Sequence, residues 1–488
     1  MKLKLRAAWL LLVCAPALAK SPKYEKPGVA TPQNWQTPSP WHEALPLDSL
    51  PKGAWWEFFA DAELNSYEQR AMANNQSLQA AIARLSEARA SARVTAAGLY
   101  PELDAAGRAT RERLAGNRPT NGAVIAPKPV TENEFTIPFT LNYEVDLFGR
   151  VRSDVQASNA SFQASAADLE NVRLLVSSEL AGDYFQVREL DSEIAVVEKA
   201  IEYQREALIL IENRHRGGAA SGLDVAQQQE VLDSSITQLA LLEQQRQQFQ
   251  HALAMLQGLP PAEFTAPVRG LEIRPPALPL AVPSEVLQRR PDIATAERNT
   301  AAANARIGVA RAALYPSISL GGGGGLDTQV INNLFNAPSL FWSLGLAALE
   351  PVIAGGRNRA QLEFARAGYQ EAVANYRETA LTAFQQVEDA LSGLNTLAAA
   401  YESQQRAVAD SERSLDLANA RYTGGLVTYL DVVTAEQLAL SNERQLTQLL
   451  GQRMTTSVLL VKALGGGWDR ASLTTIGIRP SLKQAVQQ

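Results

Sequence analysis

The chain has little of what enzymes and metalloproteins need. Its 488 residues include one cysteine, three histidines and four methionines, and aromatic residues make up 7% of the total. The histidines His42, His215 and His251 are too scattered in the sequence to suggest a ligand set. No nucleophile stands beside a candidate base, and no metal-ligand spacing occurs. The sequence therefore predicts a protein that is not an enzyme and that uses no cofactor or metal.

Two further absences exclude whole classes of protein. The net charge is −6, so no excess of basic residues points to nucleic acid as a partner. No run of 18 apolar residues occurs, so the sequence contains no candidate transmembrane helix. Abundant alanine and glutamine with 20% charged residues suit long helices better than the core of a large enzyme.

The N-terminal segment predicts export. Three basic residues precede the short apolar stretch Ala7–Val13, and Ala17-Leu-Ala19 has the small residues of a cleavage site. We therefore expect a signal peptide over residues 1–19. Its removal leaves 42 basic and 51 acidic residues, which gives a net charge of −9.

The only cysteine, Cys14, lies inside this segment and allows two interpretations. Cleavage after Ala19 leaves a mature chain without cysteine or disulfide. In the alternative, Cys14 becomes a lipidated N-terminus. Val13 is bulky where a lipoprotein signal has a small residue, and this disfavours the lipidation site.

A twelve-residue pattern occurs twice, 207 residues apart. The first copy is Arg214-His-Arg-Gly-Gly-Ala-Ala-Ser-Gly-Leu-Asp-Val225, and the second is Arg421-Tyr-Thr-Gly-Gly-Leu-Val-Thr-Tyr-Leu-Asp-Val432. Paired glycines end helices, because glycine adopts the left-handed conformation at low cost. Ser221 and Thr428 are placed to cap the helix that follows. Each copy predicts the tip of a helical hairpin, and the pair indicates internal duplication.

Proline and glycine divide the chain around these tips. Residues 149–214 and 357–422 contain no proline, which predicts helices of roughly 95 Å. The predicted segments are an extended arm (20–53), repeat 1 (54–259), a proline-rich linker (260–283), repeat 2 (284–466) and a tail (467–488). Each repeat is expected to run helix, β-hairpin (about 101–148 and about 316–354), long helix, tip (214–223 and 421–430) and helix.

The clearest strand alternates apolar and polar residues over 135–146. Its apolar positions form one candidate lipid-facing set: Phe135, Ile137, Phe139, Leu141 and Tyr143. This period of two is typical of a membrane β-strand in an exported protein, and also of a soluble sandwich. In the second repeat, a glycine-rich strand (317–327) leads to a strand over 340–349, where Trp342, Leu344 and Leu346 share a face.

Four strands in one chain cannot close a barrel, because the smallest membrane barrels need about eight. An open apolar sheet in a bilayer would leave backbone groups unpaired. We therefore expect the edges to pair with other copies. The predicted fold class is an α+β membrane protein with two internal repeats. It forms a homotrimer in which a 12-stranded β-barrel, four strands per chain, continues into a long 12-helix periplasmic α-barrel.

Several motifs together resemble those of the TolC-like outer-membrane efflux family, in the branch that works with resistance-nodulation-division pumps. They are Pro22-Lys-Tyr-Glu-Lys-Pro27, Trp55-Trp56, Leu99-Tyr-Pro101, Leu314-Tyr-Pro316, Arg289-Arg-Pro-Asp-Ile293, Gly355-Gly-Arg357 and both tips. The resemblance covers nearly the whole chain. It implies a homotrimer in outer-membrane lipid that spans into the periplasm. The implied partners are a periplasmic adaptor (membrane fusion) protein and an inner-membrane efflux transporter.

The resemblance also implies roles for the tips. Asp431 matches the family's gating aspartate, with Leu430 as an apolar constriction beside it. Tyr422 matches a tyrosine that bonds the aspartate of the first tip, here Asp224, so we expect a Tyr422–Asp224 hydrogen bond. The adaptor-binding groove is expected at Gly218, Ala219, Gly425, Leu426, Arg214 and Arg421. Thr434 stands where many relatives have a second aspartate.

The predicted function is the exit duct of a tripartite pump that exports drugs or other small toxic molecules, gated at the periplasmic tips. The exit duct of a type I protein secretion system is the alternative with the same fold. Arg289-Arg-Pro-Asp-Ile293 and the tryptophan pair favour efflux. A periplasmic adaptor, a third candidate, would lack the lipid-facing strand.

Overall fold

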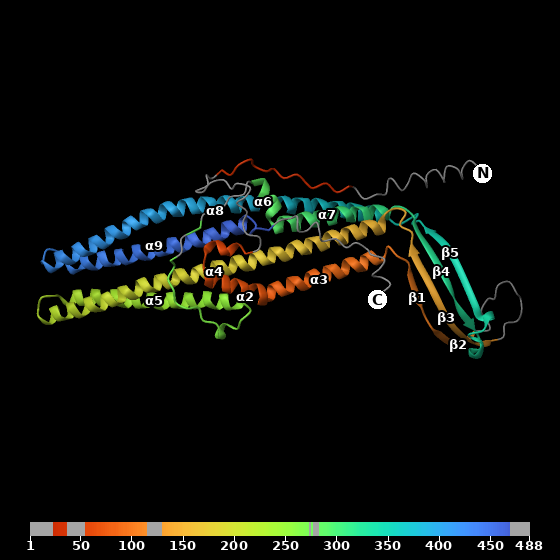
Figure 1. Ribbon diagram of the computed structural model, residues 1–488, viewed down its shortest axis with the longest axis horizontal. Helices are drawn as coiled ribbons and strands as arrows, with labels where there is room; N and C mark the ends of the chain where they lie inside the picture. The colour runs from red at the N-terminus through yellow and green to blue at the C-terminus, as the bar shows by residue number, and fades with distance from the viewer. Residues whose placement is uncertain (1–22, 37–53, 115–128, 273–274, 277–282, 469–488) are drawn as a thin grey trace.

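The computed structural model describes residues 23–36, 54–114, 129–272, 275–276 and 283–468. The predicted signal peptide, Cys14 and residues 469–488 of the predicted tail lie outside these ranges. The molecule is elongated, with a β-sheet at one end and two helical hairpins that reach the other end (Figure 1). Within the described ranges, no helix has both the length and the apolar character needed to cross a membrane.

The two repeats contain the same order of main elements. The first consists of the 3₁₀ helix η1 (Trp55–Phe59), α2 (Ala62–Asn74), α3 (Gln76–Ala97), β1 (Glu102–Ala105), β2 (Arg108–Leu114), β3 (Val130–Glu144), α4 (Arg150–Arg216) and α5 (Gly222–Leu256). The second, after η2 (Pro261–Glu263), consists of α6 (Pro283–Arg289), α7 (Pro291–Ala312), β4 (Ser317–Thr328), η3 (Ile331–Asn333), η4 (Ala337–Ser339), β5 (Leu340–Leu349), α8 (Arg357–Thr423) and α9 (Tyr429–Ala463).

The helix expected at the start of repeat 1 consists of three shorter ones. The Asp61 carboxylate accepts hydrogen bonds from the first backbone amides of α2. The Asn75 side chain accepts one from Leu78 N and so caps α3. A short polar side chain that satisfies free amides starts a new helix at each of these points. The apolar spacing of the sequence did not reveal these breaks.

The long helices α4 and α8 each contain 67 residues, which corresponds to about 100 Å. Within the described chain, α4 packs against α2, α3, α5, α7 and α9, whereas α8 packs against α7, α9 and the short α6. The helices α3 and α7 lie toward the sheet, and α5 and α9 lie toward the tips (Figure 1). Each level along the long axis therefore contains four helices from one chain.

The sheet is antiparallel, with the order β1-β3-β4-β5. The first predicted strand is split into β1 and β2, which both pair with β3 along the same edge. Between them the ladder is interrupted at residues 106 and 107, although Ala106 N still donates to Pro138 O at 3.0 Å. The described sheet thus has four strand positions, with β1 and β2 on one edge and β5 on the other.

A core at mid-length joins the repeats. Trp55 is 1% exposed, and its Nε1 donates to Ser177 Oγ on α4 at 3.0 Å. The buried Arg188 guanidinium forms ion pairs with Glu63 (2.6 Å) and Asp191 (3.0 Å). A buried charge is tolerated when it is paired in this way. The core therefore fixes α2 against α4 at the middle of the molecule.

The described part of the N-terminal arm, residues 23–36, lies along the second repeat. Tyr24 Oη donates to the Glu297 carboxylate on α7 at 2.7 Å. Gln36 N donates to Glu388 on α8 at 2.6 Å. The arm therefore runs as an extended strap across α7 and α8 (Figure 1).

Candidate functional site

The first tip turns through two glycines. Gly217 ends α4, and Gly218 has a left-handed backbone with φ +74°. Ala219 N donates to Arg214 O at 2.8 Å, which closes the turn. At the start of α5, Asp224 N donates to Ser221 Oγ, and Ser221 N donates to the Asp224 carboxylate at 2.8 Å. This reciprocal pair is a capping box that satisfies two backbone amides.

The second tip repeats this geometry. Gly425 has φ +69°, and Leu426 N donates to Arg421 O at 2.9 Å. Thr428 and Asp431 form the second capping box, in which Thr428 N donates to the Asp431 carboxylate at 3.1 Å. Both glycines sit where an added Cβ would meet nothing within 4 Å. The positive φ explains glycine there, and the open space leaves the surface of each turn accessible.

Within the single described chain, the predicted Tyr422–Asp224 hydrogen bond is not formed. The Asp224 carboxylate accepts from Ser221 N in its own tip instead. The Tyr422 ring packs against the ring of Tyr429, with centroids 5.1 Å apart, and the Arg214 guanidinium lies over it at 5.1 Å. A carboxylate next to a free backbone amide in its own turn is bonded locally at a lower entropic cost than across two hairpins.

The other predicted tip residues lie at the surface of the single chain. Leu430 is 53% exposed and Leu426 is 74% exposed. Leu430 follows the buried Tyr429 and precedes the capping Asp431, so it points away from the hairpin core. Gly218, Gly425 and Arg421 are exposed as well, and Arg214 is half-buried against Tyr422. The candidate gate and adaptor residues are therefore available for contacts with other chains.

A cavity of about 340 Å³ lies behind the tips, between α4 and α8. Three aromatic rings line it, from Tyr203, Tyr422 and Tyr429. Arg214 and Glu206 supply charges at the same cavity. Of these residues, the sequence analysis singled out Tyr422 and Arg214 but not Tyr203 or Tyr429.

The sheet at the other end has one apolar face. In an antiparallel ladder, directly opposite residues share a face, so the register places the predicted lipid-facing residues of β3 beside apolar residues of β4 and β5. The apolar part of this face includes Phe135, Ile137, Phe139, Leu141, Tyr143, Leu320, Leu326, Leu340, Trp342, Leu344 and Leu346. The register of β2 adds Arg111 and Arg113 to the same face at the end of the sheet farthest from the helices. Glycines of β4 lie between the large side chains, and a Cβ at Gly322 would lie 3.4 Å from Leu344 Cδ1.

The opposite face is acidic. The same registers place seven carboxylates and one guanidinium there, namely Glu102, Asp104, Glu112, Glu132, Glu134, Glu144, Asp327 and Arg108. One face of the sheet thus suits an apolar solvent and the other suits water and cations.

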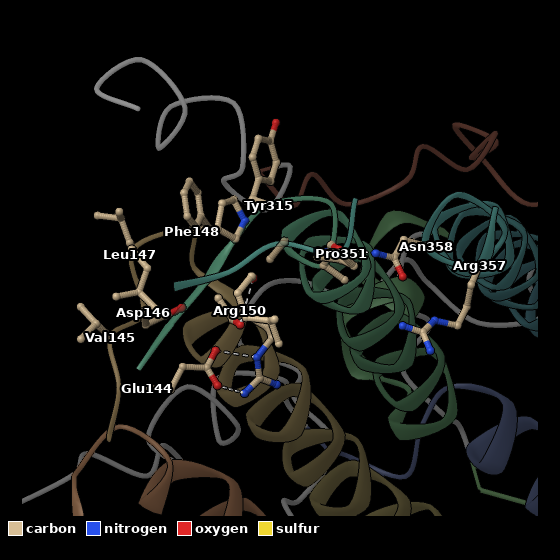
Figure 2. A pocket seen from close by; sticks show the side chains of 16 residues that line it. Glu144, Val145, Asp146, Leu147, Phe148, Arg150, Tyr315, Pro351, Arg357 and Asn358 are labelled. Carbon is tan, nitrogen blue, oxygen red and sulfur yellow. Dashed lines mark hydrogen bonds and ion pairs between the residues drawn. The ribbon is translucent and has the colours of Figure 1, made fainter. Parts of the chain in front are cut away.

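The sheet meets the helices at a junction with a cavity of about 290 Å³. Arg150 pairs with Glu144 across this junction at 2.6 Å, and the rings of Phe148 and Tyr315 stack with centroids 5.1 Å apart (Figure 2). The Asp146 carboxylate accepts from Val151 N and Arg152 N and caps α4. Although burial acts to raise it, these bonds and the Arg152 side chain hold the pKa of Asp146 below its usual value.

An antiparallel sheet with one apolar and one acidic face, continued by two helices of about 100 Å, is the arrangement expected for the wall of an outer-membrane channel with a periplasmic extension. The family model described as outer membrane efflux protein matches residues 68–259 and 282–466. The chain belongs to the outer membrane efflux protein family.

Named relatives cover almost the whole chain. It is 34% identical over 448 residues to the pyoverdine export outer membrane protein OpmQ of Pseudomonas putida, which covers 92% of this chain and 94% of that protein. It is 30% identical over 454 residues to the cation efflux system protein CusC of Escherichia coli O6:H1, with 92% and 96% covered. The solved outer-membrane channel OprN superposes with a TM-score of 0.85 at 28% identity, with 92% and 99% covered.

These relatives confirm the predicted family, function and location. The chain is an outer-membrane channel of a tripartite efflux pump, and it spans from the outer membrane into the periplasm. The likeness supports efflux and gives no support to the protein-secretion alternative. OpmQ and CusC are named for different exported substances, pyoverdine and cations.

Proposed function

We propose that three copies of this chain form one duct, gated at the helical tips, through which a partner pump expels drugs or other small toxic molecules. The single observation that carries the proposal is the one-sided sheet with two unpaired edges. In a bilayer, the free backbone groups of β1, β2 and β5 must pair with another chain. Three chains supply 12 strand positions, an even number that can close a barrel.

The helices support the same number of copies. Each chain contributes four helices at every level, so three chains give a 12-helix barrel that continues the strand barrel. In that assembly, the apolar face of the sheet would contact outer-membrane lipid. The acidic face would line the pore, which favours cations over anions.

The gate is proposed at the narrow end of this helical barrel. Three copies of Asp431 and Leu430 would approach the threefold axis, where like charges repel and leucine side chains pack. Asp224 contributes charge at the first tip, and Tyr422 packs behind the second. The exposure of Leu430 and Leu426 in the single chain supports roles in contacts between chains.

The adaptor is proposed to dock on the small residues of both turns. Gly218, Ala219 and Gly425 let a partner backbone approach closely, because no side chain stands in the way. Leu426 would supply apolar contact, and Arg214 and Arg421 would supply charge. An inner-membrane efflux transporter would complete the pump.

Current through the purified protein in a planar bilayer tests the duct and the gate together. We expect small, flickering conductance from the wild type and a several-fold larger open fraction from Asp431→Ala, because removing the charge and its capping bond loosens the second tip. Native mass spectrometry of the same sample should give three chains per particle. A particle of another size, or no current from either protein, would contradict the proposal.

A further inference from the structure

Behind the tips, a chain of buried hydrogen bonds joins the two hairpins. Tyr429, the first residue of α9, is 4% exposed, and its hydroxyl donates to Gln228 Oε1 on α5 at 2.6 Å. Gln228 Nε2 in turn donates to Gln204 O on α4 at 3.1 Å. The second hairpin is thereby tied to both helices of the first.

A second bond crosses between the hairpins nearby. Asn419 Nδ2 on α8 donates to the Tyr203 hydroxyl on α4 at 2.9 Å. Tyr203, Asn419 and Tyr429 all line the 340 Å³ cavity described above. The connection between the hairpins is therefore polar. It reaches from Tyr429 at the start of α9 to Tyr203 and Gln204, about three and a half turns before the end of α4. A hairpin that swings away to open a gate must break these bonds.

A buried carboxylate belongs to the same cluster. Glu436 lies seven residues after Tyr429 on the same face of α9 and is 4% exposed. Neither of its oxygens has a hydrogen-bond partner, and the side-chain atoms of Gln204 have none either. Burial raises the pKa of Glu436 to about 7, and the neighbouring Gln204 amide opposes this rise. An uncompensated buried charge is costly, so the packed hairpins favour the protonated acid.

Among the described residues of the single chain, no cationic side chain is a cause of the pKa shift of Glu436. The polar and charged groups that influence the pKa of Glu436, Tyr203 or Tyr429 come from all four helices. They are Tyr203 and Gln204 on α4, Asp224 on α5, Asp416 and Tyr422 on α8, and Tyr429 on α9. The half-buried Arg214 at the cavity lies over the Tyr422 ring.

We propose that Tyr429, Gln228 and Glu436 form a proton-dependent lock that holds the two hairpins of one chain together and keeps the tips closed. The lock rests on the proposed gating at the tips and deepens it. Separation of the hairpins would admit water to Glu436 and release its proton.

The direction of the pH dependence follows from the difference between the pKa of Glu436 in the closed state and in the open state. In the packed hairpins the pKa of Glu436 is raised to about 7, above the value of about 4.3 for an exposed glutamate. The proton therefore stabilises the closed state fully below about pH 4.3, and this stabilisation is lost as the pH rises toward 7. The ratio of open to closed hairpins should increase by up to about tenfold per pH unit across that window and level off above it.

Bilayer recordings at pH 5, 6, 7 and 8 test the lock. The open fraction of the wild type should rise with pH up to about 7, whereas Glu436→Gln should stay closed and insensitive to pH. Tyr429→Phe should raise the open fraction at least about fivefold at every pH, because it leaves the buried Gln228 amide oxygen unpaired.

Matched controls make the same chemical changes elsewhere on the second hairpin. Tyr401→Phe removes a hydroxyl from a ring that contacts Arg453, and Glu412→Gln neutralises an exposed acid on α8. Both should behave as wild type. The lock is overturned if Tyr429→Phe has the same open fraction as Tyr401→Phe. It is also overturned if the open fraction of Glu436→Gln changes with pH as that of the wild type does.

Hydrogen exchange of α5 and α9 keeps the test independent of current. After correction for the intrinsic pH dependence of exchange, protection near Gln228 and Tyr429 should fall with rising pH in the wild type but not in Glu436→Gln. It should be lower in Tyr429→Phe at each pH. A silent bilayer with these exchange changes would count against the duct and not the lock. Unchanged protection would overturn the lock even in a conducting channel.

Discussion

The two long helices have the same length but very different surroundings. Helix α4 is buried on several faces from Val151 to Ile211, whereas α8 buries one stripe, mostly between Tyr376 and Leu394. Among the described helices of the chain, five contact α4 (α2, α3, α5, α7 and α9) and three contact α8 (α6, α7 and α9). The two helices are equally long, but α4 lies at the centre of the subunit and α8 lies at its edge. The exposed side of α8 is where we expect the next copy to pack.

This edge also exposes large apolar residues. Phe364 is 74% exposed and Leu381 is 57% exposed on α8. At the junction with the sheet, Ile353 stands at the position equivalent to Asp146 and is 92% exposed. The repeats thus differ most where their neighbours differ. In repeat 1, Asp146 bonds to the start of α4 within the chain. In repeat 2, the equivalent Ile353 is exposed, and we expect it to contact another copy.

A charge placed on the exposed side of α8 should have the largest effect on assembly. Leu381→Asp should abolish the proposed trimer, because burying an unpaired carboxylate in each of its three interfaces would cost several kcal/mol. Native mass spectrometry in detergent would then show single chains. The control Leu381→Met keeps an apolar side chain and should remain trimeric. A trimeric Leu381→Asp protein would mean that this face of α8 is not an interface.

A smaller effect is expected from two pairs of equivalent glycines that have similar positive φ values but different surroundings. Gly258 and Gly465 have φ of +73° and +93° and press against the backbone oxygens of Asn74 and Arg289, whereas Gly218 and Gly425 face open space. A Cβ at Gly258 would lie 2.6 Å from Asn74 O. Alanine at Gly258 or Gly465 should lower the free energy of unfolding by about 3 kcal/mol or more, and alanine at either tip by about 1–2 kcal/mol.

Chemical denaturation followed by the helical circular dichroism signal would compare the four alanine variants. Equal losses at all four positions would show that the left-handed backbone alone sets the cost. Losses concentrated at Gly258 and Gly465 would confirm that close backbone packing there matters more.

The smallest expected effect concerns the two helix starts at the sheet. Asp146→Asn should cost about 1 kcal/mol, since it weakens the cap of α4, and Ile353→Asp should stabilise α8 by up to about 1 kcal/mol. The lowered pKa of Asp146 means that its contribution is present above the unfolded pKa of about 3.9 and is lost as the pH falls through the folded value. Denaturation midpoints at pH 7 and pH 3 would measure both effects. Asp146→Asn that is destabilised equally at both pH values would contradict this account.

The repeats, the hairpin tips and the alternating strand could be predicted from the sequence. These features depend on local chemistry. Glycine alone adopts φ near +70° cheaply, as at Gly218 and Gly425. Ser221 accepts from the amide three residues on, and Thr428 bonds the Asp431 carboxylate at the same spacing. Alternation over Phe135–Tyr143 requires only the pleat of a strand. The family motifs also predicted the outer-membrane location and the efflux function, which the named relatives confirm.

Two features could be found only from the three-dimensional structure. They are the polar groups that bond across the hairpins, and the breaks that divide the first predicted helix into η1, α2 and α3 and the first predicted strand into β1 and β2. The Asp224 carboxylate accepts from Ser221 N in its own turn, and the hydrogen bond across the hairpins joins Tyr429 and Gln228. These two residues are 201 positions apart, and their meeting depends on how α5 and α9 pack along their length. The register that gathers the acids on one face of the sheet is likewise set by strand pairing. Local spacing cannot specify such contacts, because they are fixed by the relative positions of distant segments.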